Sequence, residues 1–267
     1  MIRDITLGQY YPATSILHRL DPRVKIVGTF AFIISLFLFN NFIGYLFATI
    51  FLVTVIKLSK VPFSFMVKGL KAIVILLIIT IFFQLFLTPG EPIFSFYAVS
   101  ITKEGLRLAV FMAFRLTYLV IGSSVMTLTT TPNNLTDGLE RLLRPLRKLK
   151  VPVHEIAMMM SIALSFIPIL MEETDKIMKA QMARGADFES GNLIKKTKSL
   201  VPLLVPLFVS AFRRANDLAM AMEARCYRGG DGRTKMYPLV YQKRDYLAYT
   251  ACYFYLACII ATKVIWG

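Results

Sequence analysis

The chain has 267 residues, of which 56% are hydrophobic and 18% are charged, and its formal net charge is +15. A soluble domain carries about 45–50% apolar residues, so the excess requires a membrane or a very large buried interface. No low-complexity tract is present, which excludes disordered and collagen-like chains. The three cysteines form no CxxC pair and predict neither a disulfide framework nor a zinc site.

The first long apolar stretch covers residues 26–56 and is interrupted only by Asn40 and Asn41. A spanning helix needs about 20 mostly apolar residues, so the stretch fits either one long helix or two short ones. Cations lie at both of its ends, and cations mark the cytoplasmic side of a membrane. We therefore expect a hairpin of two short spans, at residues 22–39 and 42–58.

Three further spans are expected at residues 70–88, 105–129 and 246–265. The segment 89–104 between two of them is poor in cations, as an outer loop should be. Arg115 is the one cation deep within a span. We expect a structural role, in which it pairs with polar groups of the bundle or extends outward to the interface, with a substrate contact as the alternative.

Two more apolar runs, 151–170 and 200–212, are not expected to span. If both crossed, the cations of residues 171–198 would lie outside, against the positive-inside pattern. The second run is also short and contains two prolines. This part of the chain is therefore expected at the inner membrane face or under a partner. Its helices are expected at 132–148, 153–184 and 192–225.

The expected fold is all-α, a polytopic membrane bundle of about five spans with long cytoplasmic helices. The bundle would occupy residues 1–130, the cytoplasmic region 131–242 and a final transmembrane helix 243–267, with the N-terminus cytoplasmic. The cations predict contact with anionic membrane lipid, at about 1 kcal/mol per nearby cation. Because they are dispersed along the chain, they do not predict nucleic-acid binding.

A pliable surface is expected near the start of the long helix 153–184. Unbranched Met side chains can repack against more than one partner, although core filling is their commoner role. The candidate partner-contact residues are Met158, Met159, Ser161 and Ser165.

The chain shows no sign of catalysis. It has no GxxxxGK[ST] loop, no HExxH and no GxSxG, and neither His18 nor His154 has a ligand partner nearby in sequence. The expected spans also lack the midplane Asp, Glu or His of a proton-coupled carrier. A self-contained secondary carrier, or a lipid-modifying enzyme, remains as an alternative. The enzyme would depend on His154, Glu155, Glu172, Glu173 and Asp175.

An Ala-x-x-Ala-Arg sequence occurs twice, at residues 180–184 and again at 221–225, near the ends of two long helices. The arginines can simply complement the negative ends of the helix dipoles, an effect of about 0.3–1 kcal/mol. Alternatively, the small residues allow close approach to a partner, and each guanidinium forks onto a carboxylate in a groove. Two similar tips would then require two similar sockets, as in a dimeric partner.

Four stretches together resemble the transmembrane T component of energy-coupling factor (ECF) transporters, which belong to the ATP-binding-cassette class. They follow one another along nearly the whole chain. They are Gly8-Gln9-Tyr10 with Pro12, Ser15, His18-Arg19-Leu20-Asp21-Pro22-Arg23 and Lys25; Ala183-Arg184-Gly185; Ala221-Met222-Glu223-Ala224-Arg225; and Tyr227-Arg228-Gly229-Gly230-Asp231-Gly232-Arg233-Thr234-Lys235.

The resemblance implies a non-catalytic subunit for vitamin or micronutrient uptake, acting with two ATPase subunits that bind ATP and Mg²⁺. A small membrane S component would bind the substrate, and the residues expected to contact it are Met158, Met159, Ser161 and Ser165. The residues implied to dock on the ATPases are Ala183, Arg184, Gly185, Ala224, Arg225 and Cys226. Cys226 stands where the family usually has glycine, and it loses ready access to positive φ. We therefore expect the second helix to continue toward Gly229.

Overall fold

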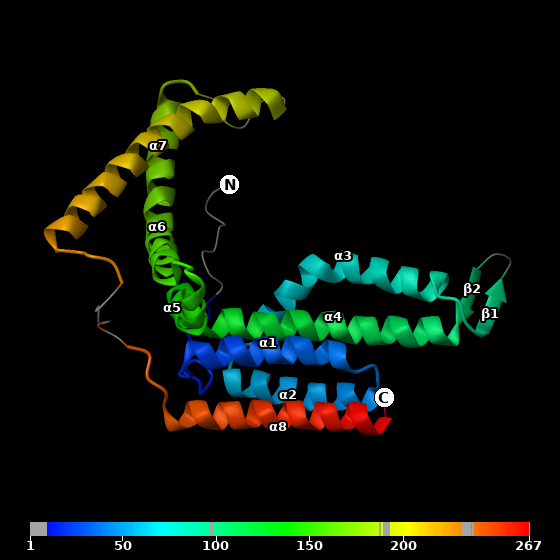
Figure 1. Ribbon diagram of the computed structural model, residues 1–267. Helices are drawn as coiled ribbons and strands as arrows, with labels where there is room; N and C mark the ends of the chain where they lie inside the picture. The colour runs from blue at the N-terminus through cyan, green and yellow to red at the C-terminus, as the bar shows by residue number, and fades with distance from the viewer. Residues whose placement is uncertain are drawn as a thin grey trace. The chain divides into compact units, whose positions relative to one another are not determined.

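The computed structural model describes residues 10–96, 99–186, 188, 193–230, 236 and 238–266. These residues belong to two compact units, shown together in Figure 1. The bundle unit comprises Gly8–Arg141 and Leu239–Gly267. The hairpin unit is Leu142–Pro238. Apart from one β-hairpin, the regular elements of the described residues are helices, which confirms the all-α class.

The helices of the bundle unit begin and end close to the expected positions, with two exceptions: α3 starts seven residues early, and the helix expected at 132–148 ends five residues early. The segment expected as an outer loop contains the antiparallel strands β1 and β2. The elements are α1 (Pro22–Leu38), α2 (Phe42–Ser59), α3 (Phe63–Leu87), β1 (Pro92–Phe96), β2 (Val99–Thr102), α4 (Lys103–Thr129), α5 (Pro132–Leu143) and α8 (Lys243–Trp266).

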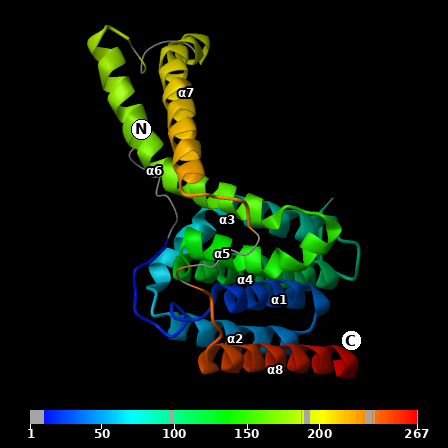
Figure 2. The same ribbon diagram turned by 60° about the vertical axis from the view of Figure 1, so that its left-hand side comes forward.

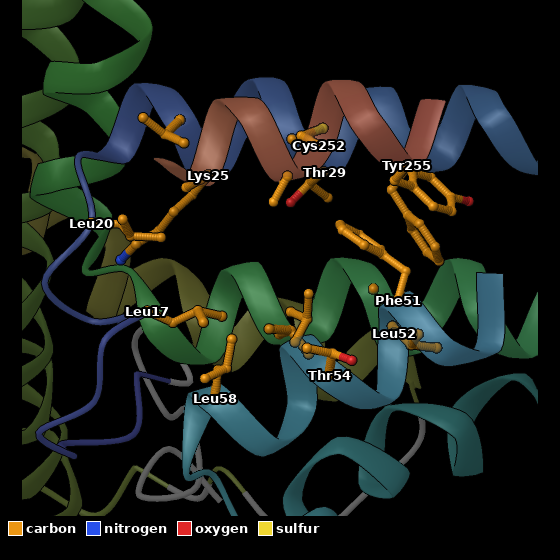
Figure 3. A pocket seen from close by; sticks show the side chains of 18 of the residues that line it. Leu17, Leu20, Lys25, Thr29, Phe51, Leu52, Thr54, Leu58, Cys252 and Tyr255 are labelled. Atoms are coloured by element: carbon orange, nitrogen blue, oxygen red, sulfur yellow. The ribbon is translucent and has the colours of Figure 1, made fainter. Parts of the chain in front are cut away.

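Helices α1, α2, α4 and α8 lie side by side, and α3 runs along α4 (Figure 1, Figure 2). Their core is aromatic: the ring centroids of Tyr45 and Phe111 lie 5.2 Å apart and those of Phe51 and Tyr255 4.3 Å apart. The Tyr45 hydroxyl also donates to the Phe111 carbonyl at 3.1 Å. Polar contacts of this kind join helices in lipid, where apolar burial alone does not. A cavity between α1, α2, α4 and α8 interrupts this packing (Figure 3).

Arg115 explains how α1 ends. Its Nε donates to the Leu36 carbonyl at 3.1 Å, and its Nη2 donates to the Phe39 carbonyl at 3.4 Å and to Asn40 Oδ1 at 2.6 Å. The last carbonyls of a helix have no partner within the helix, and the guanidinium supplies one. The structural role expected for Arg115 is therefore confirmed.

Four described helices are long and apolar enough to cross a membrane: α2, α4, α6 (Val153–Ala183) and α8. Helix α3 adds a fifth if its segments Phe63–Lys71 and Ile73–Leu87, bent by 61°, form one span. Helix α1 has 17 residues and a length of about 25 Å, slightly less than a bilayer core. By length and composition, α6 could cross the membrane. Its expected place at the inner face therefore depends on the distribution of cations alone and stays a prediction.

The hairpin unit contains the short 3₁₀ helix η1 (Arg144–Leu149), followed by α6 and α7 (Leu193–Ala224). Helices α6 and α7 are antiparallel: Glu173 contacts Arg214, while Gln181, further along α6, contacts Pro202, further back along α7. Few of their residues are buried, so most apolar side chains of this unit are available to partners or lipid.

We predict that Arg115→Met destabilises the bundle by about 1.5–3 kcal/mol, because buried carbonyls at the end of α1 lose a charged donor. Thermal unfolding in detergent would measure the change. The matched control is Lys103→Met, which removes one cation from the exposed Lys103–Glu91 pair and should cost less than about 1 kcal/mol. Equal losses in the two variants would contradict the structural role of Arg115.

Candidate docking site at two helix tips

The six residues expected to dock on a partner form two separate tips of the hairpin unit. Tip 1 is Ala183-Arg184-Gly185 at the end of α6, and tip 2 is Ala224-Arg225-Cys226 at the end of α7. All six residues are exposed. The structure therefore leaves both arginines accessible to a partner.

Tip 1 closes with two backbone hydrogen bonds. The Gly185 N–H donates to the Met182 carbonyl and the Ala186 N–H to the Gln181 carbonyl, both at 3.0 Å. Gly185 has φ +86°, in the left-handed region that glycine enters without cost. This pair of bonds is a Schellman turn, which satisfies carbonyls at the end of a helix.

Tip 2 has the same turn, 41 residues later. The Cys226 N–H donates to the Glu223 carbonyl at 2.8 Å, and the Tyr227 N–H donates to the Met222 carbonyl at 3.0 Å. Each donor and acceptor matches its counterpart in tip 1 by sequence position. The two tips are therefore one structural element used twice.

The expectation that α7 continues past Cys226 was wrong. Cys226 has φ +56°, and α7 ends at Ala224 rather than continuing toward Gly229. A left-handed residue other than glycine costs about 1–2 kcal/mol, and the two turn bonds offset this cost. A cysteine also lacks the β-branch that would make the conformation harder still.

An arginine occupies the same position in both turns, directly after the last helical residue. Because backbone donors close the turn, neither guanidinium is needed for capping. The preceding alanines, Ala183 and Ala224, keep the tip narrow. A planar guanidinium on a narrow tip suits bidentate binding of a carboxylate at the bottom of a groove. Within the described ranges, no cluster of His, Cys, Asp or Glu gathers that would hold a metal ion.

An ion pair joins α6 to α7 in the hairpin unit. Arg214 Nη2 lies 3.1 Å from Glu173 Oε2, and the 41-residue shift that relates the tips also relates these two residues. Each tip arginine follows its member of the pair by eleven residues, or about 16 Å of helix. Since the helices are antiparallel, the tips lie in opposite directions from the pair.

A second contact connects tip 1 to α7. Pro206 has no N–H, so the Pro202 carbonyl loses its usual partner within α7. The Gln181 side-chain amide donates to that carbonyl at 3.4 Å. Gln181 also supplies a carbonyl acceptor for the tip 1 turn. The proline break in α7 is thus connected to the turn at the end of α6.

The residues expected to contact an S component lie on α6. Met159 is 59% exposed and Met158 is half-buried. The Ser165 hydroxyl donates to the Ser161 carbonyl at 2.9 Å, so it is engaged within its own helix. None of these four residues lines the cavity of the bundle unit.

A more extended apolar face lies on α7, and our choice of contact residues missed it. Val201, Val205, Phe208 and Phe212 are 52%, 58%, 61% and 73% exposed. Their spacing of four, three and four residues puts them on one side of a helix. The signal was present in the apolar run 200–212, but only the helix register shows that these side chains share a face.

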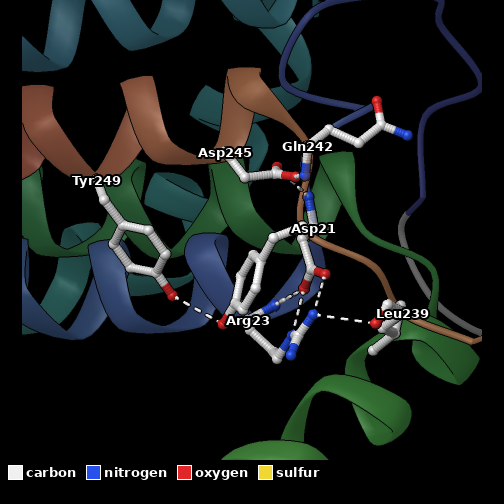
Figure 4. A network of polar contacts seen from close by, with 7 residues as sticks. Asp21, Arg23, Leu239, Gln242, Asp245 and Tyr249 are labelled. Carbon is white, nitrogen blue, oxygen red and sulfur yellow. Dashed lines mark hydrogen bonds and ion pairs between the residues drawn. The ribbon is translucent and has the colours of Figure 1, made fainter.

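The N-terminal part of the family-like sequence folds within the bundle unit, at the start of α1 and α8 (Figure 4). The Asp21 carboxylate accepts hydrogen bonds from the Arg23 backbone, Nε and Nη2 at 2.9, 3.0 and 2.7 Å. The Asp245 carboxylate accepts from the backbone N–H groups of Asp21 and Gln242 at 2.9 and 2.7 Å. We call Asp21, Arg23 and Asp245 the clasp. It joins the first helix of the unit to its last.

Charge sets the protonation state of the clasp. Burial alone would raise the pKa of Asp21, but the hydrogen bonds and charge of Arg23 lower that pKa below its usual value. The Arg23 guanidinium also lies 3.7 Å from the centre of the Tyr241 ring, a cation–π contact. Asp21 is therefore ionised at neutral pH.

His18 holds the segment before α1 against the end of α4. Its Nε2 lies 3.0 Å from the Tyr11 carbonyl, and its Nδ1 lies 2.7 Å from the Ser15 hydroxyl. Burial lowers the pKa of His18, which favours the neutral ring that donates to Tyr11 and accepts from Ser15. The Tyr11 N–H donates in turn to the Leu128 carbonyl at 2.9 Å. Of the family-like residues, Gly8, Gln9 and 231–235 lie outside the described residues.

Comparison with known proteins agrees with this arrangement. Residues 13–236 match the family model CbiQ, described as cobalt transport protein. A protein of Clostridium kluyveri named energy-coupling factor transporter transmembrane protein EcfT is 57% identical to the chain, over 100% of both chains. Proteins of the same name from Thermosediminibacter oceani and Bacillus subtilis are 52% and 51% identical. They cover 99% and 92% of this chain and 100% and 93% of their own. The chain belongs to the EcfT family.

As an EcfT family member, the chain is a transmembrane component of an ECF transporter and acts with partner subunits. It is a multi-pass membrane protein, as its apolar helices indicate. The clasp and both tips contain residues that carried the resemblance in the sequence. In the EcfT fold of this chain, the clasp residues stabilise the bundle unit, and the tips present exposed arginines.

We predict that Cys226→Gly stabilises tip 2 by about 1 kcal/mol, because glycine has no Cβ that clashes in the left-handed conformation. Hydrogen exchange of the Cys226 and Tyr227 amides, measured in wild type and variant, reports the opening of the turn. The matched change in tip 1, Gly185→Ala, should destabilise its turn by a similar amount. Space does not limit that alanine, because its Cβ would meet nothing within 4 Å. Faster exchange in Cys226→Gly would contradict the account.

The clasp predicts a pH dependence. Because the pKa of Asp21 is lowered in the folded state, its contribution to stability is present above the unfolded pKa of about 3.8 and is lost as pH falls through the folded pKa. The unfolding temperature in detergent should therefore fall below about pH 4. Asp21→Asn should lower stability at pH 7 and flatten this dependence. The control Asp217→Asn, at an exposed position on α7, should leave the curve unchanged.

Proposed function

We propose that the chain couples ATP hydrolysis by two partner ATPase subunits to the movement of a small, substrate-binding S component in the membrane. ATP and Mg²⁺ would be bound by those ATPases. The observation that carries the proposal is the repeated Schellman turn, which presents an exposed arginine in the same way at each tip.

Two identical turns are best explained by two similar sockets. A dimer of ATPases offers the same groove twice, once on each subunit. The tips lie in opposite directions from the Glu173–Arg214 pair, so one partner subunit would receive each tip. In each groove, Arg184 or Arg225 would bind a carboxylate, and the small neighbouring residues would allow the backbones to approach closely.

The two long helices would act as levers between these tips and the S component. The Glu173–Arg214 pair and the Gln181–Pro202 contact connect α6 to α7, so a displaced tip would move both helices. The exposed apolar face of α7, defined above by Val201, Val205, Phe208 and Phe212, is suited to a membrane-embedded partner. Met158, Met159, Ser161 and Ser165 on α6 would extend this surface. The proposal places the N-terminus and the hairpin unit on the cytoplasmic side.

The S component, rather than this chain, would select the substrate. We propose a vitamin or another micronutrient as the substrate class, because the N-terminal sequence resembles T components shared among several vitamin-specific S components. The chain itself would carry out no chemical step.

Charge reversal at the tips tests the proposal. Arg184→Glu and Arg225→Glu, singly and together, should reduce recovery of the ATPases with the affinity-tagged chain and abolish ATP-driven uptake in cells. A desolvated charge pair that loses one partner costs about 2–5 kcal/mol, or roughly 30- to 5,000-fold in affinity. The control is Arg213→Glu, an equal change of charge at an exposed position of α7 outside both tips.

The outcomes separate the alternatives. Normal uptake and normal ATPase recovery in the double variant would overturn the docking role. Uptake by the purified chain in vesicles, without any ATPase, would indicate a secondary carrier instead. Equal loss of membrane-inserted protein in the Arg213→Glu control would mean that the assay reports folding rather than docking.

A further inference from the structure

The bundle unit contains a cavity of about 470 Å³ between α1, α2, α4 and α8 (Figure 3). Its walls are almost entirely apolar, with Phe51, Leu52 and Leu58 contributed by α2. Interiors normally pack without voids of this size, so an apolar space of this volume within a membrane protein is expected to be filled. None of the docking residues described above lines it.

One end of the cavity is closed by aromatic rings. Phe51 and Tyr255 stack with centroids 4.3 Å apart, and Phe32 lies 5.9 and 6.0 Å from them. The Tyr255 hydroxyl is hydrogen-bonded to Ser35 at 2.8 Å, so this end of the cavity is fixed. An occupant would therefore stop at these rings.

The opposite end carries two cations, Lys25 and Arg244. Lys25 Nζ donates to the Thr129 carbonyl at 2.8 Å and to the His18 carbonyl at 3.4 Å, and an ammonium has three protons to donate. Arg244 Nε is buried and has no hydrogen-bond partner in the described part of the chain. Such a buried donor is costly unless something binds it. The cavity is thus apolar along its length and positive at one end.

The cavity opens sideways between α2 and α8. Among its lining residues, Ile50 and Leu58 on α2 are 56% and 42% exposed, and Leu247 and Phe254 on α8 are 74% and 72% exposed. Both helices are candidate membrane spans. The opening therefore faces the hydrocarbon of the bilayer rather than water.

The length of the cavity fits the acyl chain of a lipid. From Arg244 at its positive end to Tyr255 at its closed end, the wall formed by α8 advances by eleven residues, about 16 Å of helix, and half of a bilayer core is about 15 Å.

We propose that this cavity is a binding site for one anionic phospholipid. An acyl chain lies between α2 and α8, with its end against Phe51 and Tyr255. The phosphate lies at Arg244 and Lys25, where it accepts hydrogen bonds from both cations. Because Arg244 precedes Asp245 of the clasp, the bound lipid braces the start of α8 against α2.

Gly28 is a position from which a larger side chain can fill the cavity. Gly28 lines it from α1, and a Cβ at that position would meet nothing within 4 Å. Gly28→Phe should therefore occupy the space of the acyl chain, with Gly28→Leu as a smaller second variant. Gly28→Ala is the matched control, because a single methyl group leaves most of the cavity open.

The test is native mass spectrometry of the full chain, purified with its co-expressed partner subunits and incubated in detergent with equal amounts of phosphatidylglycerol and phosphatidylcholine. Wild type and Gly28→Ala should retain one more phosphatidylglycerol per chain than Gly28→Phe and Gly28→Leu. Arg244→Gln should reduce the preference for phosphatidylglycerol at least tenfold, whereas the neighbouring exposed control Lys243→Gln should preserve it.

Equal retention of phosphatidylglycerol in wild type and both bulky variants would overturn the proposal, as would equal retention of the two lipids by wild type. Binding to the isolated chain but not to the assembled complex would show that a partner subunit fills the cavity, and would also overturn it. Unfolding temperatures of the variants identify any that fail to fold. These readouts count lipid and do not depend on ATP-driven uptake, so they stand apart from the test of the helix tips.

Discussion

The end of a helix leaves backbone carbonyls without partners, and in a membrane no water is present to bind them. Much of the polar chemistry of this chain answers that constraint. Arg115 binds the last carbonyls of α1, and Lys25 binds the Thr129 carbonyl at the end of α4. Arg115 and Lys25 therefore each have a structural role at the end of a helix. In the hairpin unit the same need is met by Schellman turns, which use backbone donors alone.

The two units therefore differ in how their helices are capped. Where a side chain caps a helix, that side chain is hydrogen-bonded to the helix carbonyls. Where the backbone caps it, the arginine at the helix end stays available to a partner, as at Arg184 and Arg225. The Glu173–Arg214 pair then joins α6 to α7 and sends the two tips in opposite directions. The lever proposed for the transporter thus consists of two equivalent tips and the Glu173–Arg214 and Gln181–Pro202 contacts between their helices.

Much of this organisation could be predicted from the sequence, because hydrophobic length and cation position depend on local composition. The helices expected at 22–39 and 42–58 and the repeated Ala-Arg tips are examples. The φ of Cys226 could not be predicted, since it depends on two turn bonds whose combined effect exceeds a local preference. The cavity could not be predicted from the sequence either. It depends on how α2 and α8 separate beyond the Phe51–Tyr255 contact, between residues about 200 positions apart.

The equivalence of the two tips is the central claim, and cross-linking to the ATPases tests it most directly. Cys226 offers a natural attachment point for a thiol-reactive photo-cross-linker at tip 2, once Cys252 and Cys258 are replaced by alanine. Exchanging residues to give Gly185→Cys with Cys226→Gly moves the same probe to tip 1. The account predicts cross-links to an ATPase subunit, in similar yield, from either position. Cross-links from one tip only, or from neither, would contradict it.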